Sequence, residues 1–397
     1  MTEHTKVEKH IDVLDGLRAI AMAFVVWFHF WQQTWLTPRV KLSPEVTAIT
    51  QYFGVTSINL EGFVRYGFVF VDMLILLSAF CNFYPYARAI LLGETWPDTL
   101  TFYKKRAARI LPSYYLALLV MLLVVLAEGT AFSGDLFKDL LAHVFCVAPL
   151  FPETYLSYYF NGVLWTVQIE VLYYIVMPWI AKAFRKWPVV TCLGLWGIGI
   201  VSANVIVCNH ADSIRVYGNQ VLTFAGCYAN GMLLAMLYIL LKQKNLENTY
   251  THLAATIALF CCVLHLSGMM KELGRGELQV IQLQQRFELS LVFSVFLLAL
   301  PFACKGVKWL FSNRVVTFLA MISYNWYIWH QYIAVKLKEY HIPFWEGDTP
   351  PNQTGDKVWM WKYQILIVVV SVAVATLMTY VVEKPLAKRL LKNRKRK

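Results

Sequence analysis

The chain has 397 residues, of which 58% are hydrophobic and only 15% are charged, and its mean hydropathy is +0.51. In soluble domains about a quarter of the residues are charged. This composition therefore excludes an ordinary soluble protein and indicates one that crosses a membrane several times. The formal net charge is +12, and the positions of the basic residues account for it without a nucleic-acid partner.

The first apolar segment, residues 14–36, is long enough to cross a bilayer, yet it contains Asp15, Arg18 and His29. No cleavage site of small residues follows it, so we expect a retained helix and not a signal peptide. Arg18 and His29 are eleven residues apart, about three helical turns, which places both side chains on one face. Asp15 is expected to pair with Arg18. Because ionisable groups inside a membrane are costly, this face is predicted to be functional.

Hydropathy predicts an all-α polytopic membrane protein with about ten transmembrane helices, and an even number places both termini on one side. The apolar segment 136–151 is too short to cross and is predicted to lie at the interface or to re-enter the membrane. The ten predicted spans are residues 15–36, 66–90, 110–128, 161–183, 188–208, 219–241, 251–271, 287–304, 315–336 and 362–383.

The distribution of Lys and Arg predicts the orientation. Leaving out Arg18, the termini and the loops on their side hold 23 basic residues and the opposite loops hold 12, so both termini are predicted to be cytoplasmic. Residues 1–386 are expected to form a single membrane domain, followed by a basic cytoplasmic tail, residues 387–397, that contacts anionic lipids. The longest outward loop, residues 337–361, is polar and is expected to be flexible.

Three ionisable residues of different spans have a similar predicted depth. At 1.5 Å per residue, His29, Glu170 and His330 all fall between the middle of the bilayer and its outer third. We therefore expect two imidazoles and a carboxylate to meet there. A histidine oriented or charged by a carboxylate is suited to take a proton from a hydroxyl nucleophile. The alternative is that each residue is a buried polar group that bonds to a neighbouring helix and serves packing alone.

A second group is basic and lies at the cytoplasmic end of the third span. Arg106 and Arg109 are three residues apart and share a helix face. A planar guanidinium can donate two parallel hydrogen bonds to two oxygens of one phosphate, so this face suits a phosphate-bearing cofactor. The alternative is that topology alone requires basic residues there.

The remaining candidates are less specific. In the second span, Asp72 is a functional candidate, whereas Ser78 is expected to bond to its own helix. Most of the eight cysteines lie within or at the ends of apolar segments without metal-ligand spacing, so no metal site is predicted. A disulfide between Cys146 and Cys208 is an alternative that the sequence does not favour.

Six motifs, in this order, resemble those of the bacterial membrane acyltransferase-3 family. Its first span is defined by a basic residue, ten further residues and a histidine, here Arg18 and His29. The resemblance extends from Val13 to Leu386. The motifs are LDGLRAIAMAFVVWFH, GFVFVDMLILLSAF, FYKKRAARILPSYY, NGVLWTVQIEVLYY, ISYNWYIWHQ and YVVEKPL.

This resemblance implies transfer of an acyl group, often acetyl, from cytoplasmic acyl-coenzyme A (acyl-CoA) to a hydroxyl of a cell-surface glycan or a lipid-linked glycan. Carried over by position, Arg106 and Arg109 would help to hold the phosphates of the coenzyme. Arg18 would belong to the donor tunnel, and His29 would be the main catalytic group.

The chain also departs from the family pattern. His143 is kept, but Cys146-Val147-Ala148 interrupts the usual His-Asn ending of that external segment. Ala79 stands where the family usually has Gly, and Val171-Leu172 replace the common Glu-Gln. These changes leave the implied donor path intact and bear on the acceptor.

Together, these observations predict an O-acyltransferase of the bacterial cytoplasmic membrane that uses acyl-CoA, most often acetyl-CoA. A transporter or flippase for a glycan intermediate is the main alternative, because buried charges in ten spans also describe a carrier. A receptor that binds a ligand without turnover is the third. The paired arginines favour the enzyme, because a carrier has no need for a phosphate-binding inner mouth. The predicted catalytic residues are His29, Glu170 and His330, and the predicted donor-binding residues are Arg18, Arg106 and Arg109.

Overall fold

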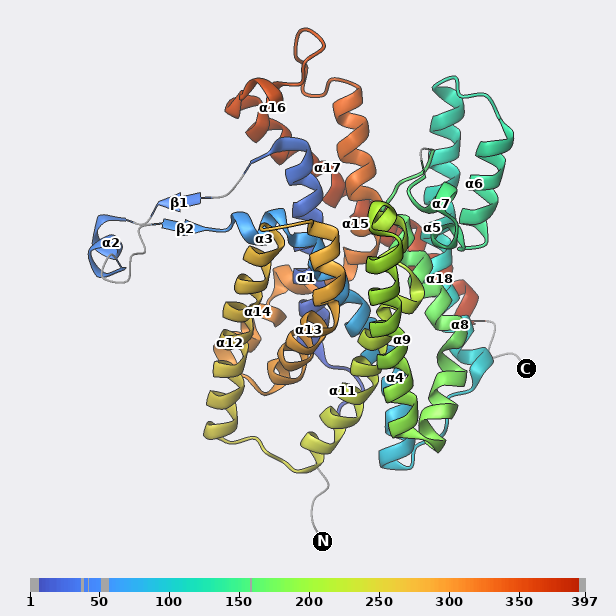
Figure 1. Cartoon of the computed structure of the whole chain (residues 1–397), viewed down its shortest axis with the longest axis vertical. Helices are drawn as coiled ribbons and strands as arrows, with labels where there is room; N and C mark the ends of the chain where they lie inside the picture. The colour runs from blue at the N-terminus through green and yellow to red at the C-terminus, as the bar shows by residue number, and fades with distance from the viewer. Residues whose placement is uncertain (1–6, 37–38, 42, 51–56, 158, 393–397) are drawn as a thin grey trace.

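A computed structural model describes residues 7–36, 39–41, 43–50, 57–157 and 159–392 (Figure 1). Within these ranges the chain is almost entirely helical, and long helices run side by side as a bundle. The long helices are α1 (Asp12–Thr34), α4 (Phe70–Leu92), α5 (Thr99–Ala127), α8 (Leu164–Lys186), α9 (Pro188–Asn209), α11 (Ala225–Gln243), α12 (Thr249–Leu273), α13 (Leu278–Ala299), α15 (Arg314–Glu339) and α17 (Lys357–Met378).

Shorter elements connect or extend these helices. Four turns of other helical type continue long helices: η2 (Gly67–Val69), η5 (Val221–Phe224), η6 (Leu300–Phe302) and the π-helical η7 (Thr379–Glu383). Two more, η3 (Ala148–Leu150) and η4 (Ala211–Ser213), lie in loops. The short α-helices are α2 (Pro44–Thr50), α3 (Glu61–Arg65), α6 (Gly134–Val144), α7 (Pro152–Tyr155), α10 (Ile214–Tyr217), α14 (Lys305–Ser312), α16 (Pro351–Thr354) and α18 (Lys384–Lys392).

The prediction of an all-α polytopic membrane protein is confirmed. Nine helices of the described chain are long and apolar enough to cross a membrane. Each of the ten predicted spans coincides with a long helix, and the one outside those nine is α15, which is 26 residues long. Its buried polar residues lower its hydropathy but bond within the bundle. Asn325 donates to Glu383 Oε2 at 2.7 Å, and Trp326 Nε1 donates to Ser371 Oγ at 3.0 Å.

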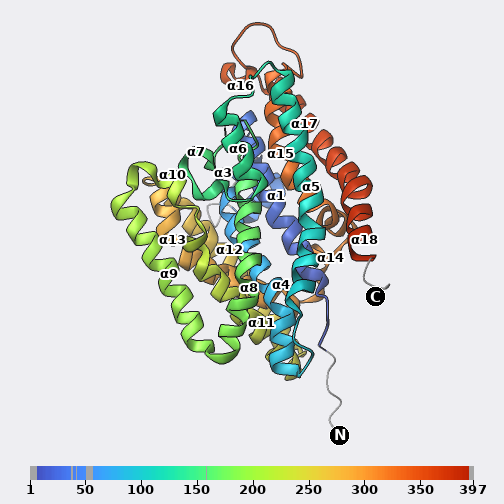
Figure 2. The same ribbon diagram turned by 90° about the vertical axis from the view of Figure 1, so that its right-hand side faces the viewer.

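The centre of the bundle is formed by α1, α4, α11 and α15. Helix α11 packs along α4, while α15 lies between α1 and α17. Figure 2 shows α16 and its loop at one end of the bundle and the first described residues, which lead into α1, toward the other. Helices α9 and α12 are largely exposed, as expected of helices that face lipid. Because ionisable and polar side chains are directed inward on the central helices, these helices position the candidate site.

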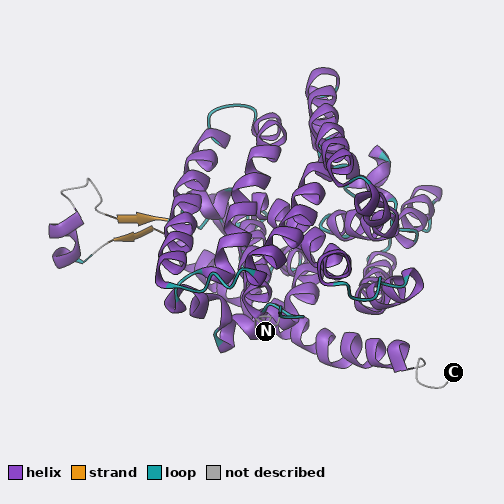
Figure 3. Ribbon diagram, turned by 90° about the horizontal axis from the view of Figure 1, so that it is seen from below, coloured by secondary structure: helices purple, strands orange, loops and turns teal. Residues whose placement is uncertain are grey.

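A small hairpin follows α1 and was not apparent in the sequence. Strand β1 (Arg39–Lys41) pairs antiparallel with β2 (Ser57–Asn59), with Val40 opposite Ile58. The hairpin and α2 stand away from the helical bundle, as seen from below in Figure 3. At three residues each, the strands leave the fold class unchanged.

Two predictions about loops have different outcomes. Segment 136–151 forms the short helix α6 and the turn η3 and does not cross the bundle, as expected. The segment 337–361, expected to be a flexible polar loop, is partly helical, because α15 runs to Glu339, α16 covers Pro351–Thr354 and α17 begins at Lys357. Its flexibility stays a prediction, and aromatic contacts connect the rest of it. His341 stacks on Trp345 at 3.8 Å between ring centroids, and Trp359 Nε1 donates to the Pro343 carbonyl at 2.9 Å. Cys146 and Cys208 are free thiols, so no disulfide joins them.

Helices α4 and α11 approach each other closely at Ala79 and Gly231. A Cβ atom at position 231 would lie 2.6 Å from the Ala79 Cβ atom and 2.8 Å from the Leu76 carbonyl oxygen. Real Cβ atoms do not approach so closely, so the two backbones touch only because residue 231 is glycine. Ala79, which departs from the family pattern, is thereby accommodated by a glycine on the facing helix.

We expect Gly231→Val to destabilise the protein by at least the roughly 1–3 kcal/mol typical of over-packing. Thermal unfolding of the purified protein in detergent should begin several degrees lower. Gly268→Val is the matched control, because no atom lies within 4 Å of a Cβ at position 268 on α12. Equal unfolding temperatures for the two variants would contradict the close contact, whereas partial rescue of Gly231→Val by Ala79→Gly would support it.

Candidate active site

A small cavity lies among α1, α4, α5, α8 and α15, in the half of the bundle nearer the start of α1. Its volume is about 100 Å³, which is room for a handful of water molecules or an acyl group. The predicted basic residues converge here from two helices, because Arg18, Arg106 and Arg109 all line it. We call it the inner cavity.

Glu170 is the acidic residue of the inner cavity. Its Oε1 atom accepts hydrogen bonds from Ser78 Oγ at 2.5 Å and from the Tyr174 hydroxyl. Asn82 Nδ2 donates to Ser78 Oγ at 3.1 Å. These bonds fix Glu170 between α4 and α8, where its charge offsets part of the positive charge of the arginines.

The arginines are held in place by different contacts. Arg18 Nη1 bonds to Asp15 Oδ1 at 3.0 Å, which confirms the predicted pair. The Arg106 guanidinium lies over the ring of Tyr174, 5.5 Å from its centroid. Arg109 lines the cavity and keeps an accessible side chain. Their guanidinium groups therefore remain available to an anionic ligand at this end of the cavity.

A larger cavity occupies the other half of the bundle. Its volume is about 680 Å³, and it is bounded by α1, α4, α13 and the loops that follow η4. His29 lines this outer cavity, as do Asp72 and Arg286. Arg286 Nε bonds to Asp72 Oδ1 at 2.9 Å, and Arg286 Nη1 bonds to the Gly218 carbonyl at 2.5 Å. This buried ion pair links α4 to α13.

His29 and His330 form a hydrogen-bonded pair. The Nε2 atom of His330 lies 2.9 Å from the Nδ1 atom of His29, and His330 is fully buried. On its other side, His330 Nδ1 faces the carbonyl oxygens of Trp326 and Tyr327 at 3.1 and 2.7 Å. Carbonyl oxygens accept only, so we assign the proton of neutral His330 to Nδ1. His330 Nε2 then accepts from His29 Nδ1, which leaves His29 Nε2 with a free lone pair.

The two cavities meet at two residues. Tyr327 of α15 and Val71 of α4 line both of them. The Tyr327 hydroxyl bonds to Thr166 Oγ1 at 2.6 Å. Tyr327 therefore stands between the arginine-lined cavity on one side and the histidine-lined cavity on the other.

The expected cluster of two imidazoles and a carboxylate is wrong for its third member. Glu170 bonds to Ser78 and Tyr174 in the inner cavity, whereas His29 lines the outer one. Counting residues gives the depth of a side chain but not the direction in which its helix face points. Ser78 was expected to bond to its own helix, and it accepts from Asn82 of α4, but its hydroxyl also donates to Glu170 of α8.

The other candidates are placed as follows. Asp72 has Arg286 as its partner, which the sequence analysis missed because the predicted span began one residue later, at 287. The signal available in the sequence was an arginine directly before an apolar segment. His143 Nδ1 bonds to the Asp139 carbonyl oxygen of α6 at 2.9 Å, and His143 lines neither cavity. It therefore orders the segment around α6.

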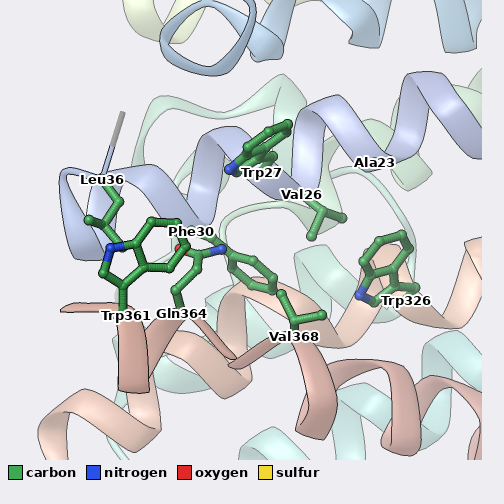
Figure 4. Close-up of a pocket in the computed structure, with 9 residues that line it drawn as sticks. All are labelled: Ala23, Val26, Trp27, Phe30, Leu36, Trp326, Trp361, Gln364 and Val368. Atoms are coloured by element: carbon green, nitrogen blue, oxygen red, sulfur yellow. The ribbon is translucent and has the colours of Figure 1, made fainter. Parts of the chain in front are cut away.

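A third cavity of about 320 Å³ is almost wholly apolar (Figure 4). Side chains of α1, α15 and α17 line it, among them Trp27, Trp326 and Trp361. Gln364 contributes the amide group to the lining of this cavity, and its side chain already accepts a hydrogen bond from Thr34 at 3.2 Å. Because it contains no ionisable group, this cavity suits an apolar chain and not the chemistry of the site.

The geometry defines a bundle of long apolar helices that encloses a buried histidine pair and an arginine-lined cavity. Comparison with known proteins shows that the chain belongs to the acyltransferase domain family, whose pattern matches residues 11–380. The protein is accordingly a multi-pass membrane acyltransferase.

Among individual proteins, the chain is similar to the peptidoglycan O-acetyltransferase OatA of Listeria monocytogenes, with 22% identity over 353 residues. The match covers 81% of this chain but 49% of the relative, so the chain spans about half the length of that protein. No solved structure matches the chain.

We expect Asp72→Leu to destabilise the fold by about 3–5 kcal/mol, because it leaves the Arg286 charge buried without its partner. Asp72→Leu/Arg286→Leu should be less harmful than the sum of the two single changes. Thermal unfolding would measure both effects. The surface pair of Glu272 and Arg275 is the control, since both side chains are largely exposed and Glu272→Ala should change nothing measurable. If Asp72→Leu were equally harmless, the ion pair would have no role in stability.

Proposed function

We propose that this protein transfers an acyl group, most often acetyl, from acyl-CoA on the cytoplasmic side to a hydroxyl of a cell-surface glycan or lipid-linked glycan on the other. The observation that carries the proposal is the meeting of an arginine-lined and a histidine-lined cavity at Tyr327, from opposite halves of the bundle. The excess of basic residues near the termini supports a cytoplasmic start for α1.

The inner cavity suits the donor in both charge and size. Arg106 and Arg109 lie where phosphate groups of a coenzyme would arrive, and guanidinium groups bind phosphate oxygens in pairs. At about 100 Å³, the cavity admits an acyl group and the end of its carrier, while a nucleotide would stay at the mouth. Arg18 lines the same cavity from α1, with Asp15 beside it to hold its position. Coenzyme A, when bound, supplies the acyl group as a thioester.

The histidine pair supplies the proton transfer. His29 Nε2 takes the proton of the acceptor hydroxyl while the hydroxyl oxygen bonds to the acyl carbon. The bond from that carbon to sulfur breaks, and His29 returns the proton to the departing sulfur, so the products are an ester and a thiol. His330 is a positioning residue, because its Nε2 atom holds the proton of His29 on Nδ1. Glu170 acts in the donor cavity by ordering Ser78 and Tyr174.

The nature of the acceptor is supported by similarity. The relative in Listeria monocytogenes is named as a peptidoglycan O-acetyltransferase, which supports a hydroxyl of a surface polymer as the acceptor here. By the same reasoning, we propose that the protein lies in the bacterial cytoplasmic membrane. Its basic tail, of which residues 393–397 lie outside the described part of the chain, would contact anionic lipids.

Oriented proteoliposomes test transfer across the membrane. With acetyl-CoA only on the side of Arg106 and a glycan fragment only on the other, we expect the glycan to be acetylated and free coenzyme A to appear in equal amount on the donor side. His29→Ala should fold normally but lower the rate by about 10²–10⁴, as is typical for loss of an acid–base group. Glycan movement without thioester cleavage would establish a carrier in place of an enzyme.

The second expectation concerns donor affinity. Replacing Arg106 or Arg109 with Ala should raise KM for acetyl-CoA by about tenfold or more, because each removes a charged contact to phosphate. Lys at either position should rescue only part of the loss, because it lacks the paired donors of a guanidinium. Lys104→Ala is the control, since Lys104 is exposed on the same helix and lines neither cavity. Full rescue by Lys at both positions would show that these arginines serve only to set the membrane orientation and do not bind the donor.

A further inference from the structure

The outer cavity carries more positive than negative charge. Three arginines, Arg65, Arg215 and Arg286, line it together with one acidic residue, Asp72. Arg286 and Asp72 neutralise each other at 2.9 Å. Two arginine charges are therefore left for whatever enters the cavity.

Neither Arg65 nor Arg215 forms an ion pair within the described part of the chain. Arg65 ends α3, and its guanidinium lies 5.9 Å from the ring of Trp31 and 5.7 Å from that of Tyr66. Aromatic faces at this distance attract a cation and limit where it moves. Arg215 lies in α10, which packs against α13 across the cavity mouth. The two charges thus flank the route to His29 from separate elements.

Uncharged amide side chains also line the cavity, among apolar and aromatic residues, and this mixture suits sugars. Gln32, Gln279, Gln282 and Gln331 line the cavity, and their side chains make no hydrogen bond to any residue that the structure describes. Each amide both donates and accepts, as hydroxyl groups require. Trp165 adds an aromatic surface.

One buried atom provides independent support. Asp72 is 1% exposed, and its Oδ2 atom has no hydrogen-bond partner, although Oδ1 is bonded to Arg286. Buried polar atoms are normally bonded, so an unpaired carboxylate oxygen beside a cavity indicates a place for a ligand donor. A sugar hydroxyl would supply such a donor.

We propose that the acceptor is an anionic glycan, in which a carboxylate or phosphate group binds between Arg65 and Arg215 while a hydroxyl of the same molecule reaches His29. This inference rests on the proposed function and adds the charge of the acceptor to it. The amides and the Asp72 Oδ2 atom bind the uncharged hydroxyls, and the two arginines select the charged group. Because both arginines lie at the mouth, charge also draws the acceptor toward the cavity.

Three oligosaccharides of equal length test the inference: one neutral, one with a carboxylate and one with a phosphate. Binding to the purified full-length protein is measured by calorimetry, and transfer from acetyl-CoA is measured in the same detergent. We expect an anionic oligosaccharide to bind about tenfold or more tightly than the neutral one. The preference between carboxylate and phosphate identifies the group. Raising the salt concentration should weaken the anionic preference.

Variants assign the preference to the two arginines. Arg65→Gln and Arg215→Gln should each remove part of the preference for the anionic glycan, and the double variant should abolish it without changing binding of the neutral one. Both side chains are exposed at the mouth, so folding should be unaffected. Arg275→Gln is the control, because this arginine carries the same charge but does not line the cavity.

The outcomes separate the inference from the proposed function. Equal binding of neutral and anionic glycans, or an anionic preference that survives the double variant, would overturn the anionic acceptor while leaving transfer to hydroxyls intact. A second outcome is that the double variant loses the preference for the anionic glycan but no glycan receives an acetyl group from acetyl-CoA. This outcome would support the anionic site and overturn the proposed donor. If the double variant loses both the tighter binding of the anionic glycan and transfer to it, while the neutral glycan is unaffected, the result would support the anionic acceptor and the proposed function together.

Discussion

The interior of a membrane offers no water to polar groups, so the buried charges and imidazoles of the central helices need partners, and several take them from other helices. His29 of α1 bonds to His330 of α15, Asp72 of α4 bonds to Arg286 of α13, and Glu170 of α8 bonds to Ser78 of α4. These bonds connect helices that are far apart in sequence. The same groups that would be costly when isolated therefore fix the relative positions of the central helices.

This arrangement also separates two chemical environments within one bundle. The inner cavity is small and holds three arginines, whereas the outer cavity is several times larger and is rich in amide groups. A compact site for a group in transfer and a roomy site for a polyhydroxy acceptor have these contrasting properties. The histidine pair stands at the edge of the larger cavity, where the proposed mechanism would bring an acceptor hydroxyl to Nε2 of His29.

The sequence predicted the elements well because hydropathy over twenty residues is a strong signal. It also predicted the Asp15–Arg18 pair and the shared face of Arg106 and Arg109, since both follow from helical periodicity. Contacts between helices were harder. His29 and His330 were expected to meet and do so, but Glu170 has a similar depth and points into another cavity. Depth follows from counting residues, whereas the rotation of each helix is decided by packing.

Arg286 shows a further limit of hydropathy. It lies at the edge of an apolar segment, and the predicted span did not include it. The partner of Asp72 was therefore not considered. The close contact of Ala79 and Gly231 was likewise beyond reach, because a glycine in a helix has no pattern that reveals which helix it faces.

Tyr327 has a consequence beyond the positions of the substrates. A bundle with polar cavities from both faces is close to being a pore, and a continuous file of water would let protons leak across the membrane and dissipate its electrochemical gradient. Tyr327 lies where the two cavities meet, and its hydroxyl is tied to Thr166. Under the proposed function, an aromatic ring at that point would let substrates from the two sides of the membrane come within reach of His29 without a continuous file of water between them.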